Sequence, residues 1–265
     1  MIDIFSIIEK VHKQRPLIYH IANIVTANDC ANSILAIGGS PIVSQEIEEV
    51  EDLISISDAV VINIGTATKE LTKVILKAAD DAKKRNIPII LDPVGIGSSR
   101  FRTDIAIRLI EMVRPVIRCN YSEFLTLAGI KTETRGVDSV QNDFYDTDVI
   151  SSLAKALETT IIVTGVEDII SNGTNLAILG NGNSLMEKVS GTGCICTSLI
   201  GATCAVNDGD YYNAAIAATA LMGICGETAS ANFTGTASLK NDIIDNLSMI
   251  NKDSFYSNLK LEERF

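Results

Sequence analysis

Residues 59–93 read AVVINIGTATKELTKVILKAADDAKKRNIPIILDP, and this stretch decides the fold class. Its two ends, 59–65 and 87–93, are runs of β-branched residues closed by Gly or Pro, which is typical of buried strands. Between them, residues 68–86 form a helical pattern with lysines on one face and an apolar face made of Leu71, Val74, Ile75 and Ala78. This order predicts a right-handed crossover between two parallel neighbouring strands.

The same alternation of short apolar runs and helical patterns continues through the chain. Further strands are predicted at residues 16–21, 40–44, 115–120 and 160–165. Residues 168–183 predict two antiparallel strands joined by a Ser-Asn-Gly turn. The N-terminus reads as an amphipathic surface helix, and the region after residue 194 is strongly helical in pattern. Because no internal repeat or linker occurs, residues 1–265 are predicted to form one α/β domain around a doubly wound sheet.

The composition excludes some classes of partner. The chain has 265 residues, 46% of them hydrophobic, and a formal net charge of −11. This charge argues against nucleic acid or an anionic membrane surface, because phosphate backbones need a basic footprint. An anionic ligand would have to be held by local dipoles, by a metal ion or by a single well-placed arginine.

The chain is expected to be cytoplasmic. Its first 15 residues, MIDIFSIIEKVHKQR, lack the charged start and apolar core of a signal peptide. The longest apolar runs, near 194–206 and 213–225, contain Thr, Ser and Gly and are shorter than a bilayer span. Six cysteines without a C-x-x-C pair, and only two histidines, make a zinc site improbable. Most of these thiols are expected to be small core residues.

Polar residues and glycines follow four of the apolar runs. They are Asp92, then Asn120 with Glu123, then Thr164 with Gly165, and finally the Ser-Gly-Thr-Gly-Cys sequence after residues 188–189. In an open α/β sheet, ligands bind beyond the carboxyl ends of the strands, so these residues are predicted to share one rim. Purely structural roles stay open for each: Asp92-Pro93 as a plain turn, Ser122 with Glu123 as a helix cap, and the glycines as packing positions.

Residues 188–200, KVSGTGCICTSLI, join a glycine turn to a helical pattern. The free backbone N–H groups at such a helix start form an anion site. A phosphate-handling site more often carries an acid where Cys194 stands, so Cys194 is either a buried filler or an unusual reactive residue. Cys196 points to another helix face and is predicted to be core. No P-loop motif occurs, and Gly95-x-Gly97 lacks the third glycine of a dinucleotide fingerprint.

Several motifs in fixed order carry a family resemblance. The set LDPVGIGSSRFRT, VIRCNYSE, IIVTG and KVSGTGC resembles hydroxyethylthiazole kinase of thiamine salvage, in the ribokinase-like superfamily. Residues 16–44, the VVINIGT run, GVDS at 136–139 and GICGETAS near 223–230 also match. The resemblance implies a ribokinase-like three-layer α/β fold, with a mostly parallel central sheet and helices on both faces. It also implies ATP- and Mg²⁺-dependent phosphorylation of 4-methyl-5-(2-hydroxyethyl)thiazole by a homotrimer whose substrate pocket lies between subunits.

The resemblance also assigns roles to individual positions. Cys194 matches the cysteine that replaces the usual aspartate base of the superfamily, with Gly191 and Gly193 beside it in the catalytic turn. The nucleotide contacts would be Arg118, Asn120 and Thr164. The acids around Mg²⁺ and the phosphates would be Asp92 and Glu123. The substrate contacts would be Asn23, Val43, Gly65 and Gly191.

The substrate half of the site departs from the family pattern. The usual H-N-I-T-N reads Tyr19-His20-Ile21-Ala22-Asn23 here, and the methionine that usually contacts the thiazole is Val43. Cys119 and Ser190 replace a usual glycine and threonine in the nucleotide half, where Ser keeps the hydroxyl. Two alternatives therefore stay open: a kinase for a related vitamin precursor of the hydroxymethylpyrimidine type, and a non-catalytic nucleotide-binding regulator. The sequence also leaves the direction of the pKa shift of Cys194 open.

Overall fold

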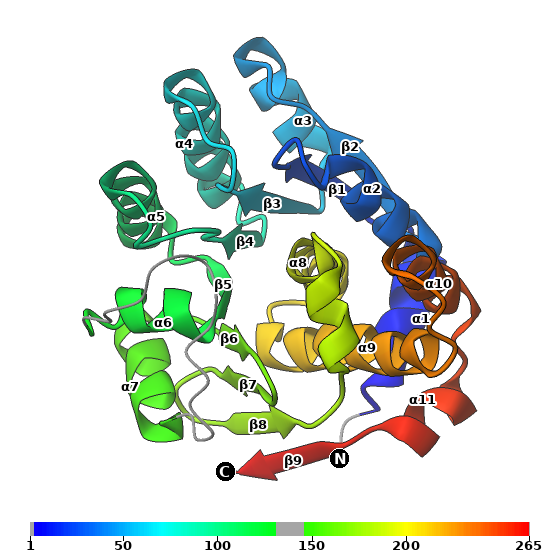
Figure 1. Cartoon of the computed structure of the whole chain (residues 1–265). Helices are drawn as coiled ribbons and strands as arrows, with labels where there is room; N and C mark the ends of the chain where they lie inside the picture. Colours follow the sequence, from blue (N-terminus) through cyan, green and yellow to red (C-terminus); the bar gives the residue numbers. More distant parts are fainter. Residues whose placement is uncertain (1–2, 131–145, 265) are drawn as a thin grey trace.

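A computed structural model describes residues 3–130 and 146–264, so the matching GVDS at 136–139 lies outside the described residues. Nine strands form one sheet in the order β2-β1-β3-β4-β5-β6-β7-β8-β9 (Figure 1). Their bounds are β1 Leu17–Ile21, β2 Ser40–Val43, β3 Ala59–Asn63, β4 Ile89–Asp92, β5 Val116–Asn120, β6 Ile161–Thr164, β7 Asp168–Ser171, β8 Leu176–Leu179 and β9 Leu261–Arg264. The order confirms the predicted doubly wound arrangement.

Strands β1 to β6 are parallel, and β7, β8 and β9 are added antiparallel. All six predicted parallel strands and the predicted β7–β8 hairpin are confirmed. The expectation of helix throughout the C-terminal region missed β9. Its sequence Leu-Glu-Glu-Arg is short and polar, and the strand exists because it pairs in register with β8, about 85 residues earlier in the chain.

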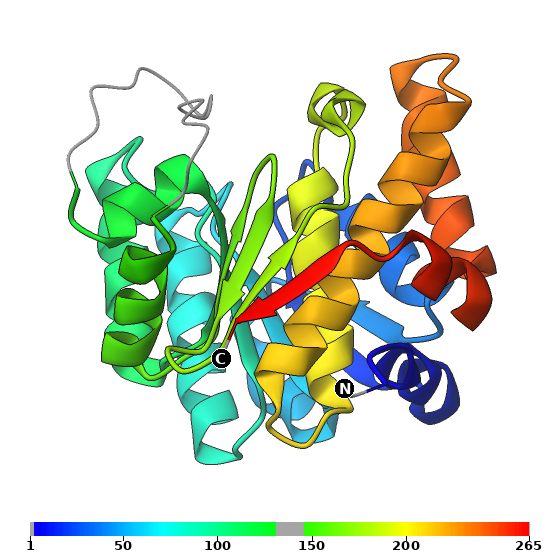
Figure 2. The same cartoon turned by 90° about the horizontal axis from the view of Figure 1, so that it is seen from below.

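Helices cover both faces of the sheet and make three layers (Figures 1 and 2). One face packs against α1 Phe5–Gln14, α2 Ala27–Ala36, α8 Thr192–Ala205, α9 Tyr211–Ala231, α10 Thr236–Met249 and α11 Lys252–Asn258. The other packs against α3 Val50–Ile56, α4 Lys69–Lys84, α5 Arg100–Val113, α6 Tyr121–Leu127 and α7 Thr147–Leu157. Short 3₁₀ helices, η1 Ile47–Glu49 and η2 Ser184–Lys188, complete the described elements.

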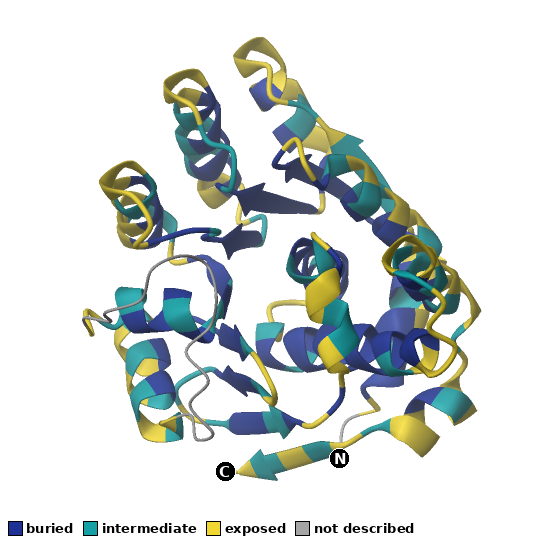
Figure 3. Cartoon of the chain, viewed as in Figure 1, coloured by how far each residue is buried: buried dark blue, intermediate teal, exposed yellow. Residues whose placement is uncertain are grey.

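The helices differ in how much of their surface the core covers. In α4, the predicted apolar face of Leu71, Val74, Ile75 and Ala78 is buried, as expected for a surface helix. In contrast, α8 and α9 are buried almost all round (Figure 3). Cys196 lies in that core, as predicted, and all six cysteines are buried and unpaired with one another. Complete burial explains why α8 and α9 carry small and apolar residues on every side.

The prediction that the apolar run near residues 213–225 is shorter than a bilayer span was wrong. The helix α9 extends to 21 residues, 211–231, and by length and composition alone it could cross a membrane. In the structure, 83% of its apolar window is buried inside the protein. It is therefore packed as a core helix against α8, α10 and the sheet.

The carboxyl ends of the central strands line up at one rim. In the register, Asn63 at the end of β3 is paired with Asp92 at the end of β4, and Asn120 of β5 is paired with Thr164 of β6. This confirms three of the four predicted strand ends. The fourth prediction, a strand before the glycine turn, was wrong. Residues 184–188 form the 3₁₀ helix η2, and the glycine turn connects η2 to α8.

Candidate active site at the start of α8

The turn before α8 leaves the start of the helix open. Gly191 is the N-cap residue with φ of +97°, a left-handed conformation that favours glycine, and no side chain caps the helix. A Cβ at this position would lie 2.6 Å from Cγ2 of Thr26. The first N–H groups of a helix have no acceptor within the helix. The start of α8 therefore has the free donors and the positive dipole end that an anion site requires.

Cys194 lies in the first turn of α8 and accepts two hydrogen bonds at its sulfur. The donors are Nδ2 of Asn63, at 3.1 Å, and Nδ2 of Asn23, at 3.5 Å. Burial raises the pKa of the Cys194 thiol to about 12, and the negative charge of Asp92 adds to the effect. The group is therefore a neutral thiol at physiological pH, which decides the direction that the sequence left open.

Asp92 is fully buried at the end of β4. Its Oδ2 accepts hydrogen bonds from Asn63 Nδ2, at 2.8 Å, and from Thr197 Oγ1, at 3.1 Å. Its Oδ1 has no hydrogen-bond partner and lies 3.9 Å from Nη1 of Arg118. Burial raises the pKa of Asp92, and the charge of Arg118 offsets part of this effect. The bend at Asp92-Pro93 thus carries a buried polar group, which a plain turn would not need.

Arg118 brings a largely buried positive charge to the site, with 13% of its side chain exposed. It extends from β5, donates to Oγ1 of Thr164, and faces the first turn of α8. A Cβ on Gly193 would lie 2.3 Å from its Nη1, so the guanidinium group fills the space that a side chain there would take. Burial works against the charge of Arg118, but the carboxylate of Asp92 holds its pKa above the ordinary value. The arginine therefore stays charged.

Asn120 and Glu123 form a capping box at the start of α6. Asn120 Oδ1 accepts from the backbone N–H of Glu123 at 2.8 Å, and Glu123 Oε2 accepts from the N–H of Asn120 at 2.9 Å. Glu123 Oε1 accepts from the N–H of Gly95 at 2.8 Å. Burial raises the pKa of Glu123, and the charge of Asp92 adds to this. The alternative of a helix cap is thus correct for Glu123, but the N-cap residue is Asn120 and not Ser122.

The predicted substrate contacts are only partly brought together. Asn23 is buried, and its Oδ1 accepts from the N–H groups of Val25 and Thr26 at 3.0 and 3.1 Å. The N–H of Gly65 donates to Oδ1 of Asn63 at 2.9 Å. Val43 instead lies half exposed at the end of edge strand β2, two strands away from β3. Asn23 and Gly65 therefore lie in the hydrogen-bonded cluster, and Val43 lies on the outer edge.

The residue at the centre of this cluster is Asn63, which the sequence did not single out. Its side chain hydrogen-bonds to Asn23, Gly65, Asp92 and Cys194. The available signal was the polar residue that ends the apolar run VVIN, a position equivalent to that of Asp92 in the next strand. Thr197, one helical turn after Gly193, was also missed. Its link to the site is the hydrogen bond to Asp92, which the sequence does not reveal.

Asp168 is a third residue near the site that the sequence did not single out. It starts β7, and its Oδ1 accepts the N–H of Gly165 at 3.0 Å in the turn that follows Thr164. Burial raises the pKa of Asp168 to about 7, against smaller opposing effects of the Gly165 N–H and the charge of Arg118. Since the folded-state pKa lies above the unfolded value, the folded chain binds the extra proton, and stability falls as pH rises from about 4 to about 7.

We therefore expect Asp168→Asn to raise the melting temperature at pH 8 but not at pH 4. The neutral amide keeps an acceptor for Gly165 and removes the cost of ionising the carboxyl group. A gain of about 1 kcal/mol, or about 2–4 °C, is expected at pH 8. Calorimetry of both chains across this pH range measures the difference, with Asp253→Asn on the exposed surface as the control. A difference that does not change with pH would contradict the expectation.

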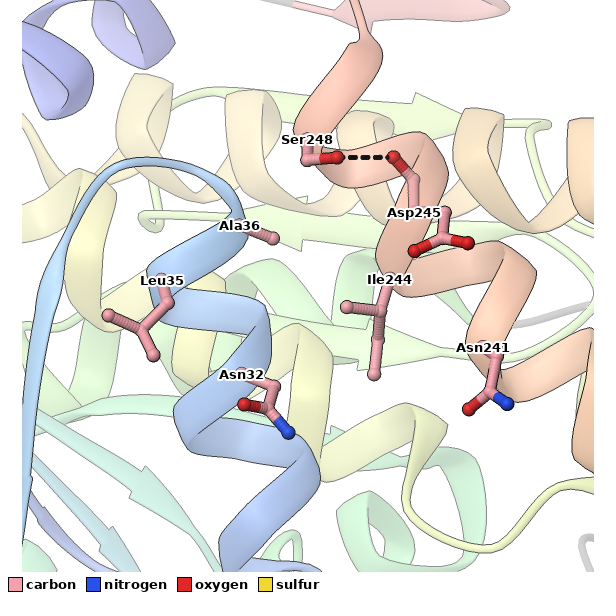
Figure 4. A pocket seen from close by; sticks show the side chains of 7 residues that line it. All are labelled: Asn32, Leu35, Ala36, Asn241, Ile244, Asp245 and Ser248. Atoms are coloured by element: carbon pink, nitrogen blue, oxygen red, sulfur yellow. Dashed lines mark hydrogen bonds between the residues drawn. The ribbon is translucent and has the colours of Figure 1, made fainter.

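A groove between α2 and α10 is separate from this cluster. It has a volume of about 600 Å³ and is lined by Asn32, Leu35, Ala36, Asn241, Ile244, Asp245 and Ser248. Figure 4 shows Ile244 extending from α10 into the space between the two helices, with Asn32, Leu35 and Ala36 on α2 and Asn241, Asp245 and Ser248 on α10 around it. None of the predicted site residues lines the groove, so it belongs to the outer surface of the helical layer.

Comparisons with known proteins agree on one family. The model of the hydroxyethylthiazole kinase family matches residues 8–253. The hydroxyethylthiazole kinase of Clostridium beijerinckii is 41% identical over 270 residues, which cover 99% of this chain and 98% of that protein. The structure of the hydroxyethylthiazole kinase protein from Pyrococcus horikoshii OT3 matches with a TM-score of 0.90 and 31% identity, over 99% of both chains.

A more distant structure supports the fold alone. A ribokinase-like superfamily protein from Enterococcus faecalis V583 matches with a TM-score of 0.62 and 16% identity, over 94% of this chain and 93% of that one. Together with the observed layers, this match confirms the ribokinase-like three-layer fold that the motifs implied.

Proposed function

This chain belongs to the hydroxyethylthiazole kinase family, and from this premise we propose that it transfers the γ-phosphoryl group of ATP to the hydroxyl of 4-methyl-5-(2-hydroxyethyl)thiazole. The observation that carries the proposal is the uncapped start of α8, with Cys194 in its first turn and the guanidinium group of Arg118 against Gly193. The single sheet supports one kinase domain.

Phosphoryl transfer depends on position and charge more than on covalent help from the protein. In this proposal, the N–H groups at Thr192, Gly193 and Cys194 stabilise the negative charge that develops on the transferring group. Arg118 supplies a fixed positive charge beside them, and Thr164 holds its guanidinium group in place. Asn120, which is paired with Thr164 in the register, is the third nucleotide contact of this proposal.

Cys194 orients the substrate hydroxyl in this scheme. Its sulfur is a neutral thiol that faces the amide groups of Asn23 and Asn63, so it is a weak base. A weak base is sufficient when the transition state is loose, because the alcohol then needs little deprotonation before the phosphoryl group moves. The turn and Arg118 carry most of the charge stabilisation, which makes a cysteine acceptable at this position.

The buried carboxylates fit Mg²⁺ unequally. Asp92 fits well, because its Oδ1 is buried without a hydrogen-bond partner, and carboxylate oxygen is a preferred ligand of Mg²⁺. Glu123 fits less well, since both of its oxygens already accept backbone N–H groups. Within residues 3–130 and 146–264, no group of three or more His, Cys, Asp or Glu side chains could hold a metal, so the phosphates of ATP would complete the site. Bound Mg²⁺ would neutralise charge on those phosphates.

ADP release from ATP and Mg²⁺ tests the proposal, with hydroxyethylthiazole and hydroxymethylpyrimidine offered in parallel. We expect release with the thiazole. Release with the pyrimidine alone would assign the chain to the related kinase and would focus attention on His20, Ala22 and Val43. ATP binding without transfer to either alcohol would favour the non-catalytic regulator.

We expect Cys194→Ser to lower kcat by about tenfold or more, while the Kd for ATP stays within about twofold. The serine oxygen lies closer to Cβ than the sulfur does, so it is displaced from the position at which the thiol orients the substrate hydroxyl, but the nucleotide half of the site is unchanged. Steady-state kinetics and calorimetric titration with a non-hydrolysed ATP analogue measure the two effects. Turnover close to that of the natural chain would make Cys194 a packing residue.

We also propose a homotrimer in the cytoplasm, with the thiazole bound between subunits. Exposed apolar side chains support this: Ile24 and Val25, which follow Asn23 in the chain, are 75% and 67% exposed, and Leu35 and Val43 are also exposed. Exposed apolar side chains of this size are covered when a second copy packs against them, as the proposed trimer would do. Sedimentation equilibrium of the natural chain and of Val25→Asp decides the point, since a monomer in both would remove the proposal.

A further inference from the structure

We infer that Asn63 is a positioning residue that holds Cys194, Asp92 and Asn23 in register for phosphoryl transfer, an assignment that rests on the proposed function. Asn63 is 1% exposed and ends β3, a strand whose other residues are Ala, Val and Ile. Burying an amide group costs free energy unless all of its hydrogen bonds are made. An apolar residue here would leave the N–H of Gly65 and the buried carboxylate of Asp92 without this partner, so the amide is present for its hydrogen bonds.

The hydrogen bonds of Asn63 fix the orientation of its amide group. The two protons on Nδ2 point to Oδ2 of Asp92, at 2.8 Å, and to Sγ of Cys194, at 3.1 Å. Its Oδ1 accepts from Nδ2 of Asn23, at 3.1 Å, and from the N–H of Gly65, at 2.9 Å. The reversed amide would place oxygen against the carboxylate of Asp92. All four polar positions are thus satisfied in a single orientation.

The two ends of the amide therefore serve different parts of the site. The nitrogen end joins Asp92 on β4 to Cys194 on α8, two elements that also meet through the hydrogen bond from Thr197 to Asp92. The oxygen end holds Asn23 and the backbone of Gly65, which lie on the substrate side. Asn63 connects the metal and catalytic positions to the substrate positions without itself touching the transferred group. A displacement of the sulfur by a fraction of an ångström would misalign the hydroxyl.

The test is a double-mutant cycle with Asn63→Ala and Cys194→Ala, measured by ADP release on addition of hydroxyethylthiazole. In the natural chain we expect Asn63→Ala to lower kcat by about 10- to 100-fold, because two buried partners lose a donor. In the Cys194→Ala background we expect the same change to lower kcat only a few fold. A residue that acts through another loses much of its effect when the other is absent.

A matched control separates positioning from folding. Asn207 is a buried asparagine beyond the far end of α8, with its side chain bonded to Lys10 and to the backbone of Asp210. Asn207→Ala should lower the melting temperature without changing kcat. If Asn63→Ala folds poorly, Asn63→Ser replaces it in the test. Serine keeps a small donor and acceptor, so this variant should retain part of the turnover.

Each outcome of the double-mutant cycle either supports or overturns the positioning role of Asn63. Asn63→Ala with kcat within twofold of the natural chain would reduce Asn63 to a structural amide, and an equal loss in both backgrounds would show that it does not act through Cys194. If the natural chain releases no ADP, the proposed reaction fails. The positioning role is then judged by calorimetric binding of the thiazole alcohol. Asn63→Ala must weaken this binding several fold, because Asn23 and Gly65 lose their acceptor, and unchanged binding would overturn the inference.

Discussion

Arg118→Met is expected to lower kcat by about 10³- to 10⁵-fold, the range measured when a single arginine that stabilises phosphoryl transfer is removed. The net charge of the chain is −11, and Arg118 places a positive charge against Gly193 at the start of α8. Its side chain is 13% exposed and its guanidinium group is held by Thr164, so the charge is fixed in place.

The same change should also weaken the fold. Asp92 is fully buried and lies 3.9 Å from Nη1 of Arg118. Removing the positive partner leaves an uncompensated buried carboxylate, which costs about 3–5 kcal/mol of unfolding free energy unless Asp92 takes up a proton. A protonated Asp92 would in turn be a poorer ligand for Mg²⁺.

Kinetics at saturating ATP and denaturant unfolding measure these two effects of Arg118→Met. Arg108→Met, on the exposed side of α5, is the matched control and should leave both quantities close to those of the natural chain. A variant of Arg118 that turns over within tenfold of the natural chain would show that the backbone turn alone stabilises the transferred group. It would also remove Arg118 from the proposed site.

Gly193→Ala is expected to lower kcat/KM by about 10²- to 10³-fold, comparable to the loss of one oxyanion donor. A Cβ at Gly193 would lie 2.3 Å from Nη1 and 2.7 Å from Nη2 of Arg118. No real side chain tolerates such contacts, so the guanidinium group must move away from the start of α8. The added methyl group would also occupy the space in front of the free N–H groups.

The control for this change is Gly235→Ala. Gly235 is likewise the residue at the start of a helix, α10, but its backbone is extended and no atom lies within 4 Å of the added Cβ. It should leave kcat/KM unchanged. Activity of Gly193→Ala within a few fold of the natural chain would mean that Arg118 can shift without loss, and would contradict its proposed place beside the phosphoryl group.

Much of the fold could be predicted because its signals are local. The buried strands β3 and β4 are continuous β-branched runs, and α4 between them has a clean apolar face. Where a sequence pattern is typical of more than one kind of element, the predictions were less complete. The apolar run near residue 213 belonged to a longer core helix, and the four residues of β9 carry no strand pattern at all.

The site was predicted in part for a similar reason. Asp92, Asn120 and Thr164 follow apolar runs, and parallel strands place such ends on one rim. Asn63 follows such a run too, but a single asparagine there gives no sign that it will meet Asp92 and Cys194. On the substrate side, Asn23 and Gly65 meet Asn63, whereas Val43 lies at the end of edge strand β2, and its contact with the substrate stays a prediction.

The sequence by itself determined the alternation of strands and helices, the order of the motifs and the family. These properties depend on residue type and spacing along the chain. Only the tertiary structure decided that Arg118 fills the space beside Gly193, 75 positions later, that Asn63 connects the two halves of the site, and that the Cys194 thiol is neutral. Contacts between distant segments and the loss of water around a buried group arise when the layers pack, so no local pattern encodes them.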